Sequence, residues 1–198
     1  LCGVACQKII AEVLDKNNLH KGISTVVIGD ANIGKLMSAD KRIPLVSATG
    51  STRMGKSVGE VVGKRLGKSL LELGGNNAVI LTPNADLKMV IPALVFGAVG
   101  TTGQRCTSTR RLIIHEEIYQ NVKIAMVNAY NQLRIGDPLD ESNHVGPLID
   151  PDAVKMYLDA IQAAKLEGGN VVVEGGQLSG AGYESNCYVK PVIIEAEN

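Results

Sequence analysis

The sequence is poor in aromatic residues and carries no net charge. Only 3% of its 198 residues are aromatic, with one phenylalanine and no tryptophan. Proteins that bind single-stranded nucleic acid stack the bases on aromatic side chains, so this class is disfavoured. The 20 Lys and Arg residues balance the 20 Asp and Glu residues, which argues against a polyanionic partner. We therefore expect no nucleic-acid partner.

Long apolar runs and metal-binding cysteine patterns are also missing. No run approaches the roughly 20 apolar residues that cross a bilayer, and no secretory leader opens the chain, so no membrane partner is expected. The four cysteines, Cys2, Cys6, Cys106 and Cys187, form no CxxC pair and have no zinc spacing with histidine, so no metal site is expected. A reducing, cytoplasmic location is predicted. Cys2 and Cys6 lie four residues apart on one helix face and are expected to be buried.

What the sequence does contain is an alternation of helical and strand-like patterns, with 45% apolar residues to form a core. This alternation predicts an α/β fold with crossover connections and a mostly parallel sheet. Pro92 lies inside one helical pattern and is expected to kink it. Helices are predicted at 2–18, 31–40, 51–66, 85–100, 117–133 and 151–169, and strands at 24–30, 43–49, 68–73, 78–82, 108–116, 170–176 and 188–196.

Two glycines, Gly74 and Gly75, interrupt the chain between the third and fourth predicted strands. We place a domain boundary there, which divides the chain into residues 1–74 and 75–198. The first residues begin inside a helical pattern, and "VKPVIIEAEN" stops just after a strand-like run. Both ends are therefore expected to be cuts in a longer chain.

The stretch "GSTRMGKS", Gly50 to Ser57, matches the phosphate-loop pattern and stands between an apolar run and a helical pattern. A helix that begins here attracts phosphate through its free N–H groups, and Ser51 is expected to cap the helix and touch a phosphate oxygen. A nucleoside triphosphate site also needs Lys56 on the terminal phosphates, Ser57 on magnesium and a later strand that ends in Asp. No convincing strand of that kind follows, so a P-loop nucleotidase is the weaker alternative.

Cys106 is the candidate nucleophile. It lies in "GTTGQRCTSTRR", a glycine-containing loop between a helix and a strand, with polar neighbours and the cation Arg105 beside it. A thiol reacts as the thiolate, which needs exposure, a base or nearby positive charge, whereas structural cysteines usually lie in apolar runs. The sequence therefore favours a reactive Cys106.

Glu72 is the candidate base, because nothing pairs His20, His115 or His144 with Cys106. Glu72 lies at the end of an apolar strand, and the carboxyl ends of parallel strands border the ligand crevice. Apolar surroundings there would raise the pKa of Glu72 and suit it to act as a base near neutrality. An exposed carboxylate at the strand end is the alternative.

Three motifs in this order, "GSTRMG", "LELGG" and "GQRC", resemble the aldehyde dehydrogenase superfamily. The interval of 34 residues from Glu72 to Cys106 fits the family, and "SLLELGGNNAVI" with "GTTGQRCTSTRRL" most resembles its antiquitin branch, the α-aminoadipic semialdehyde dehydrogenases. The resemblance implies a Rossmann-like parallel sheet portion, the C-terminal part of a dinucleotide-binding domain, in residues 1–74. Residues 75–198 would be part of an α/β catalytic domain. It also implies NAD as cofactor, with NADP not excluded, an aldehyde substrate and a homo-oligomer, a dimer or tetramer.

The resemblance further implies a role for each motif residue. Cys106 would attack the aldehyde and hold the oxyanion with its own N–H, while Glu72 would activate the water that hydrolyses the thioester. Arg105, whose planar fork suits a carboxylate, would bind the distal carboxylate of a semialdehyde. A CoA-acylating relative, which generally lacks the deacylating glutamate, and a truncated relative without turnover stay open as alternatives. The implied cofactor contacts are Gly50, Ser51, Gly55, Leu73 and Gly74.

Overall fold

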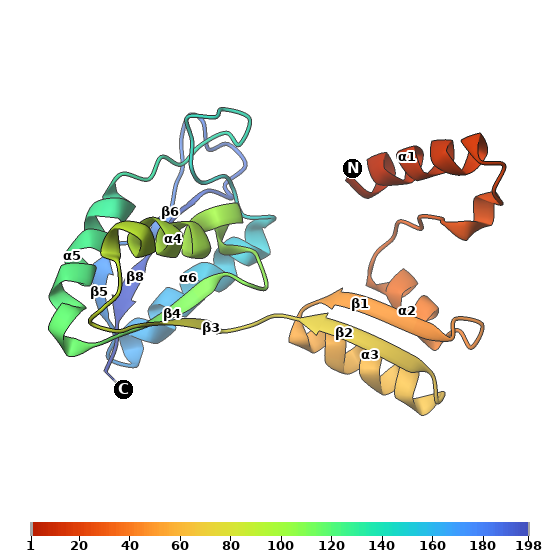
Figure 1. Cartoon of the computed structure of the whole chain (residues 1–198), viewed down its shortest axis with the longest axis horizontal. Helices are drawn as coiled ribbons and strands as arrows, with labels where there is room; N and C mark the ends of the chain where they lie inside the picture. The colour runs from red at the N-terminus through yellow and green to blue at the C-terminus, as the bar shows by residue number, and fades with distance from the viewer. Residues whose placement is uncertain (1, 198) are drawn as a thin grey trace. The chain divides into compact units, whose positions relative to one another are not determined.

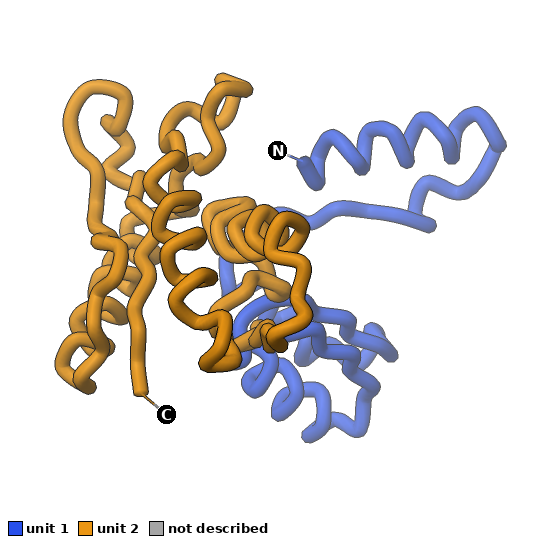
Figure 2. Tube along the Cα trace, turned by 60° about the vertical axis from the view of Figure 1, so that its left-hand side comes forward, with its two compact units in different colours: residues 1–73 blue, residues 74–198 orange. Residues whose placement is uncertain are grey.

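The computed structural model describes residues 2–197, and the chain divides into two compact units (Figure 2). The first unit comprises residues 1–73 and the second unit residues 74–198. The division falls between Leu73 and Gly74, one residue before the boundary expected from the glycine pair. Each unit is described by itself, and the roles of the two as cofactor-binding and catalytic domains stay predictions.

The first unit is built around a parallel pair of strands joined by a helix (Figure 1). Strands β1 and β2 pair from Leu45 with Lys68 to Gly50 with Leu73, and the connecting helix α3 packs against both strands. This is the strand–helix–strand unit that the alternating pattern predicted. In chain order the elements are α1 (Cys2–Lys16), the 3₁₀ turn η1 (Lys21–Ile23), α2 (Ala31–Ala39), β1 (Leu45–Gly50), α3 (Thr52–Lys64) and β2 (Lys68–Leu73).

Two predictions for the first unit are wrong. Residues 24–30 form no strand, because no described segment pairs with them, and a strand requires a neighbour for its N–H and C=O groups. Their apolar side chains are exposed, up to 74% for Ile28. Cys2 and Cys6 are exposed rather than buried, since α1 buries only Leu14 among the described residues.

The second unit combines a parallel strand pair with two antiparallel pairs (Figure 1). Strands β3 and β4 are parallel, whereas β5 pairs with β8 and β6 with β7 in antiparallel fashion. The predicted last strand is split around Pro191, which lacks the N–H that a ladder requires. The elements are β3 (Asn77–Leu81), α4 (Leu87–Val99), the 3₁₀ turn η2 (Gly100–Gly103), β4 (Thr109–Ile114), α5 (Glu116–Asn131), α6 (Pro151–Leu166), β5 (Asn170–Val173), β6 (Gly176–Gln177), β7 (Val189–Lys190) and β8 (Ile193–Glu195).

Besides a cluster of Val154, Cys187 and Val189, the second unit has a core cluster between the β3–β4 pair and helices α4 and α5. Its buried members are Leu81, Leu94, Val122 and Met126, and Val122 has no exposed surface. Helix α4 continues through Pro92, so the proline does not end it, and the kink stays a prediction. Within residues 2–197 no helix combines the length and apolar character needed to cross a membrane.

Candidate active site

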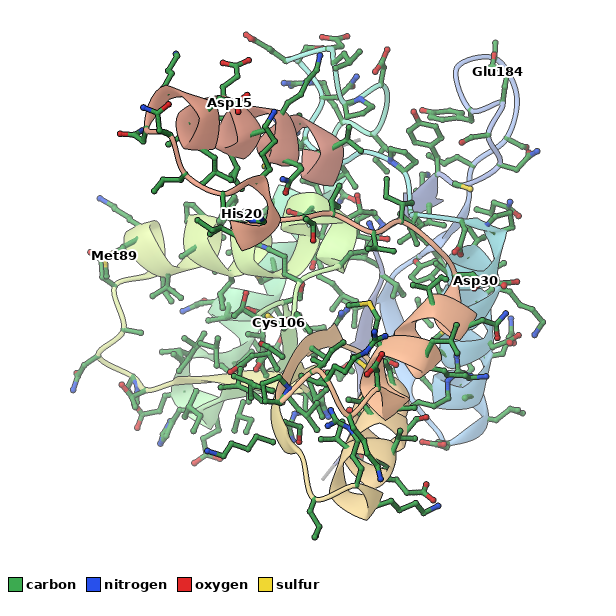
Figure 3. The ribbon with its side chains drawn as sticks, turned by 90° about the vertical axis from the view of Figure 1, so that its right-hand side faces the viewer. Asp15, His20, Asp30, Met89, Cys106 and Glu184 are labelled. Carbon is green, nitrogen blue, oxygen red and sulfur yellow. The ribbon has the colours of Figure 1, made fainter. Side chains whose placement is uncertain are left out.

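The turn that carries Cys106 connects η2 to β4 and is closed by hydrogen bonds within itself. The N–H of Ser108 donates to the carbonyl of Arg105 at 3.1 Å. The N–H of Arg105 in turn donates to Oγ of Ser108 at 3.1 Å. Ser108 is fully buried, whereas Cys106 is exposed (labelled in Figure 3). A buried hydroxyl therefore holds the turn while the thiol stays accessible to a reactant.

The start of β3 also holds this turn. Nδ2 of Asn77 donates to the carbonyl of Cys106 at 2.7 Å and to that of Ser108 at 3.0 Å. Arg111 donates from Nε and Nη2 to the carbonyl of Asn76, at 3.2 and 2.9 Å. The structure thus brings the "GGNN" and "GQRC" segments together. Sequence reasoning missed Asn77, and the only signal was a polar amide at the start of an apolar strand.

The loop that leads into the Cys106 turn has an uncommon backbone. Thr101 and Thr102 are both left-handed, with φ of 55° and 54°, a conformation that costs energy for a β-branched residue. Oγ1 of Thr102 donates to the carbonyl of Gly146 at 3.1 Å, and Oε1 of Gln104 accepts from the N–H of Ile149 at 3.0 Å. These bonds tie the loop to residues far along the chain and hold the left-handed conformation in place.

The guanidinium of Arg105 is directed at helix α4. Nη2 donates to the carbonyl of Phe96 at 2.8 Å, and the guanidinium carbon lies 4.7 Å from the centroid of the Phe96 ring. Gly100 makes room for it, because a Cβ there would lie 2.6 Å from Nη2. Nε of Arg105 is buried and has no hydrogen-bond partner among the described residues. The role of Arg105 as a carboxylate ligand stays a prediction.

The three histidines serve as backbone hydrogen-bond acceptors. Nδ1 of His115 accepts from the N–H of Glu117 at the start of α5, and Nδ1 of His144 accepts from the N–H of Arg134. In the first unit, Nδ1 of His20 accepts from the N–H of Gly22. No hydrogen bond links a histidine to Cys106 in residues 2–197, and no trio of metal-binding side chains occurs there.

In the first unit, the N-terminus of α3 lies at the carboxyl end of β1. Oγ of Ser51 accepts from the N–H of Met54 at 3.1 Å, which confirms Ser51 as the N-cap. The first turn contains Arg53 and no acidic residue, and both Gly50 and Ser51 are exposed. Free N–H groups and the positive end of the helix dipole, with no acidic residue in the first turn, suit an anion.

The same geometry argues against a nucleoside triphosphate loop. In a phosphate loop the backbone between the two glycines wraps around the phosphates. Here α3 already begins at Thr52, and the N–H of Gly55 donates to the carbonyl of Ser51 at 2.9 Å. Lys56 and Ser57 are exposed residues of the helix. The match to "GSTRMGKS" therefore describes a helix N-terminus and not a phosphate-binding loop.

The predicted cofactor residues of the first unit lie close together at the end of the β1–β2 pair. Gly50 and Leu73 are register partners. A Cβ on the buried Gly55 would lie 2.5 Å from one methyl group of Leu73 and 2.6 Å from the other. Gly55 thus allows α3 to pack against the end of β2. Gly74, which is exposed, follows as the first residue of the second unit.

Glu72 lies at the same end of the pair but differs from its sequence prediction. It pairs in register with Thr49 and is exposed. The apolar surroundings expected from "LLELGG" are wrong for the described residues, because the flanking leucines occupy the opposite face of the strand. The structure agrees with the alternative, a carboxylate in solvent at the strand end.

Comparison with known proteins decides the family. A family model described as "Aldehyde dehydrogenase family" matches residues 3–198. The chain belongs to the aldehyde dehydrogenase family. Over 194 residues it is 47% identical to the alpha-aminoadipic semialdehyde dehydrogenase of Mus musculus, covering 98% of this chain and 35% of that protein. It is 44% identical to aldehyde dehydrogenase family 7 member B4 of Arabidopsis thaliana, covering 98% of this chain and 38% of that protein.

Solved aldehyde dehydrogenase structures agree with the fold. Glyceraldehyde-3-phosphate dehydrogenase GapN from Methanocaldococcus jannaschii, complexed with NADP, aligns with a TM-score of 0.89 at 29% identity, covering 98% of this chain and 41% of GapN. Aldehyde dehydrogenase C from Pseudomonas syringae, complexed with NAD+ and octanal, aligns with a TM-score of 0.78 at 28% identity, covering 85% of this chain and 35% of that one. The chain is thus a third to two fifths as long as these relatives.

The family assignment confirms the resemblance found in the three sequence motifs. The parallel pairs β1–β2 and β3–β4, each joined through a helix, agree with an incomplete α/β aldehyde dehydrogenase fold. The assignment to this family carries no residue roles with it. The roles of Cys106, Glu72, Arg105 and the cofactor residues therefore stay predictions.

Proposed function

We propose that the protein to which this chain belongs oxidises an aldehyde to a carboxylic acid with a nicotinamide dinucleotide, and that Cys106 is its nucleophile. The observation that carries the proposal is the Cys106 turn, an exposed thiol on a buried, hydrogen-bonded support in an aldehyde dehydrogenase chain. The substrate class is a carboxylate-bearing semialdehyde such as α-aminoadipic semialdehyde. The 47% identity to the Mus musculus enzyme of that name supports this choice.

Cys106 acts first. Its sulfur bonds to the aldehyde carbon, and the carbonyl oxygen becomes an oxyanion that the N–H of Cys106 stabilises. Oxidation of this adduct leaves a thioester on the sulfur. Water then attacks the thioester carbon, the carboxylic acid leaves, and the thiolate of Cys106 is restored.

Glu72 is the proposed base for the hydrolytic step. Its carboxylate takes a proton from the attacking water, a role that an exposed group at the carboxyl end of a parallel strand can serve. A CoA-acylating enzyme would transfer the acyl group to a thiol instead, and the presence of Glu72 favours water. Arg105 is proposed to bind the distal carboxylate of the semialdehyde, because its planar guanidinium fork matches a carboxylate.

The first unit fits a dinucleotide. The capped N-terminus of α3, with Arg53 and no acidic residue in its first turn, suits a pyrophosphate, and we assign Gly50 and Ser51 to it. Leu73 and Gly74 are proposed to lie on the nicotinamide side, and Gly55 is proposed as a further cofactor-binding residue. When bound, the nicotinamide supplies the acceptor for the hydride of the substrate. NAD is the proposed form, with NADP as the alternative, and a homo-oligomer is the proposed assembly.

The Cys106→Ala substitution in the full-length protein tests this function. We expect the rate of NAD(P)H formation from a semialdehyde to fall by roughly a thousandfold or more, because no other group can form the thioester. Dinucleotide binding, measured by fluorescence titration, should persist. Cys2→Ala is the matched control, since it removes an exposed thiol from α1 and should leave the rate unchanged.

Turnover by Cys106→Ala at the wild-type rate would refute the proposal. A wild-type protein that binds dinucleotide but oxidises no aldehyde in a panel of semialdehydes and simple aldehydes would favour the non-catalytic relative. ATP hydrolysis by the wild-type protein that is lost in Lys56→Ala would favour the alternative function, a P-loop nucleotidase.

A further inference from the structure

The backbone on both sides of Cys106 is held by hydrogen bonds. The peptide before Cys106 contains the Arg105 carbonyl, which accepts from the N–H of Ser108 at 3.1 Å. The peptide after Cys106 contains the Cys106 carbonyl, which accepts from Nδ2 of Asn77 at 2.7 Å. Each peptide is planar, so a hydrogen bond to its carbonyl restrains the orientation of the whole unit. The two bonds together restrain the backbone dihedrals of Cys106, and with them the directions of its N–H and its Cα–Cβ bond.

Asn77 contributes more than one of these constraints. Its Nδ2 also donates to the carbonyl of Ser108 at 3.0 Å, so one amide group binds two carbonyls of the turn. Asn77 and Cys106 are 29 residues apart in sequence, and Asn77 is the first residue of β3. The turn is therefore anchored to the parallel strand pair as well as closed by its own hydrogen bonds.

We propose that Asn77 is a positioning residue for the nucleophile Cys106, an inference that rests on the proposed function. Its amide fixes the peptide that follows Cys106, so that the sulfur and the oxyanion-binding N–H keep the geometry that attack on a carbonyl needs. A misplacement of about 1 Å at a reacting group can cost about a hundredfold in rate. Asn77 acts through the Cys106 backbone and makes no contact with the reactants.

Gly75 is part of the same arrangement. A Cβ on Gly75 would lie 2.9 Å from Oδ1 of Asn77 and 3.1 Å from the carbonyl oxygen of Cys106. Both distances are shorter than a normal carbon–oxygen contact, so a side chain here would push the amide and the carbonyl apart. The absence of a side chain at Gly75 therefore allows the bond between Asn77 and Cys106.

Asn77→Asp and Asn77→Ala in the full-length enzyme test the proposal. Asn77→Asp keeps the shape but replaces the donor with an oxygen facing two carbonyls, and Asn77→Ala removes the donor without adding charge. We expect kcat to fall by about ten- to a hundredfold in both, with the KM for the aldehyde and the affinity for NAD(P) close to wild type. Asn76→Asp and Asn76→Ala are the matched controls. They make the same changes one residue earlier, where the side chain is exposed and forms no hydrogen bond in the part of the chain described.

A double-mutant cycle with Gly75→Ala separates positioning from general stability. If both residues act through the one bond to Cys106, the double variant Gly75→Ala/Asn77→Ala should lose no more kcat than the worse single variant. If the fold-loss of kcat in the double variant equals the product of the two single fold-losses, the inference is overturned. A kcat for Asn77→Asp equal to that of Asn76→Asp, or a loss of kcat that tracks lost NAD(P) binding and a lower Tm, would also overturn it.

The two proposals fail in different ways. Turnover by Cys106→Ala at the wild-type rate would refute the role of Cys106 as nucleophile, and with it the proposed function. If Cys106→Ala is inactive but both Asn77 variants have the wild-type kcat, only the positioning role of Asn77 is refuted.

Discussion

Three glycines of helix α3 offer a test of how the first unit packs. Gly55, Gly59 and Gly63 lie four residues apart and therefore on one face of the helix. A Cβ on Gly55 would lie 2.5 Å from a methyl group of Leu73, whereas one on Gly59 would lie 3.5 Å from a methyl group of Leu71, an ordinary contact. A Cβ on Gly63 would meet nothing within 4 Å. A glycine-to-alanine substitution therefore adds a methyl group in three different environments: a clash at Gly55, an ordinary contact at Gly59 and open space at Gly63.

Gly55→Ala is expected to destabilise the protein. Alanine is favoured over glycine within a helix by about 1 kcal/mol, but overpacking at a buried site costs about 1–3 kcal/mol. The net change for Gly55→Ala is a loss of about 1 kcal/mol. Gly59→Ala, which has the propensity gain without the clash, should stabilise by about 0.5–1 kcal/mol. Because the propensity gain is common to both, their difference of about 1–3 kcal/mol measures the packing against Leu73.

Urea and thermal unfolding of the full-length variants give these differences. A titration with NAD(P) adds a second readout, since a shift of Leu73 should weaken dinucleotide binding in Gly55→Ala and not in Gly59→Ala. A Gly55→Ala variant as stable as Gly59→Ala would refute the reasoning, because it would show that Leu73 moves aside at no cost.

Two further predictions concern the N-cap of α3 and a charged cluster of the second unit. Ser51→Ala should lower stability by about 1 kcal/mol through loss of the cap and should also weaken NAD(P) binding. Asp150→Ala, which removes the cap of α6, should affect stability alone, and equal NAD(P) affinities in the two variants would contradict the phosphate assignment. Hydrogen bonds from Tyr119 and Lys123 lower the pKa of Glu195 to about 2, from an ordinary value of 4.5. This carboxylate therefore stabilises the fold above about pH 4.5, and its contribution is lost as the pH falls towards 2. In Glu195→Gln the stability measured by circular dichroism should depend less on pH between about 4.5 and 2 than in the wild type. An unchanged pH profile would contradict the stabilising role of the Tyr119–Lys123–Glu195 cluster.

The hydrophobic pattern of the sequence predicted the positions of several helices and of the strands that find a partner. Strand β2 has the bounds that the sequence predicted, and α3 and α5 begin and end within two residues of theirs. Residues 24–30 show the limit of such reasoning. Their β-branched pattern predicts a strand, but a strand also requires a partner, and local propensity does not supply one.

The candidate site shows the same contrast between features set by local sequence and features set by distant contacts. Motif order and local chemistry singled out Cys106, Glu72 and Ser51, and the structure confirms the cap at Ser51 and the exposure of Cys106. The surroundings of Glu72 were predicted wrongly, because burial depends on what packs against a strand and not on its neighbours in sequence. Asn77 was missed because its partner lies 29 residues away.

The sequence alone therefore determined the class of this chain: an alternating α/β pattern, three ordered motifs of the aldehyde dehydrogenase family and a polar loop around one cysteine. These are local properties, set by hydrophobic period, turn residues and spacing. Only the tertiary structure decided that Gly55 makes room for Leu73 and that Asn77 holds the backbone of Cys106. Each of these depends on contacts between segments distant in sequence, which form only when the strands pair and the helices pack on them.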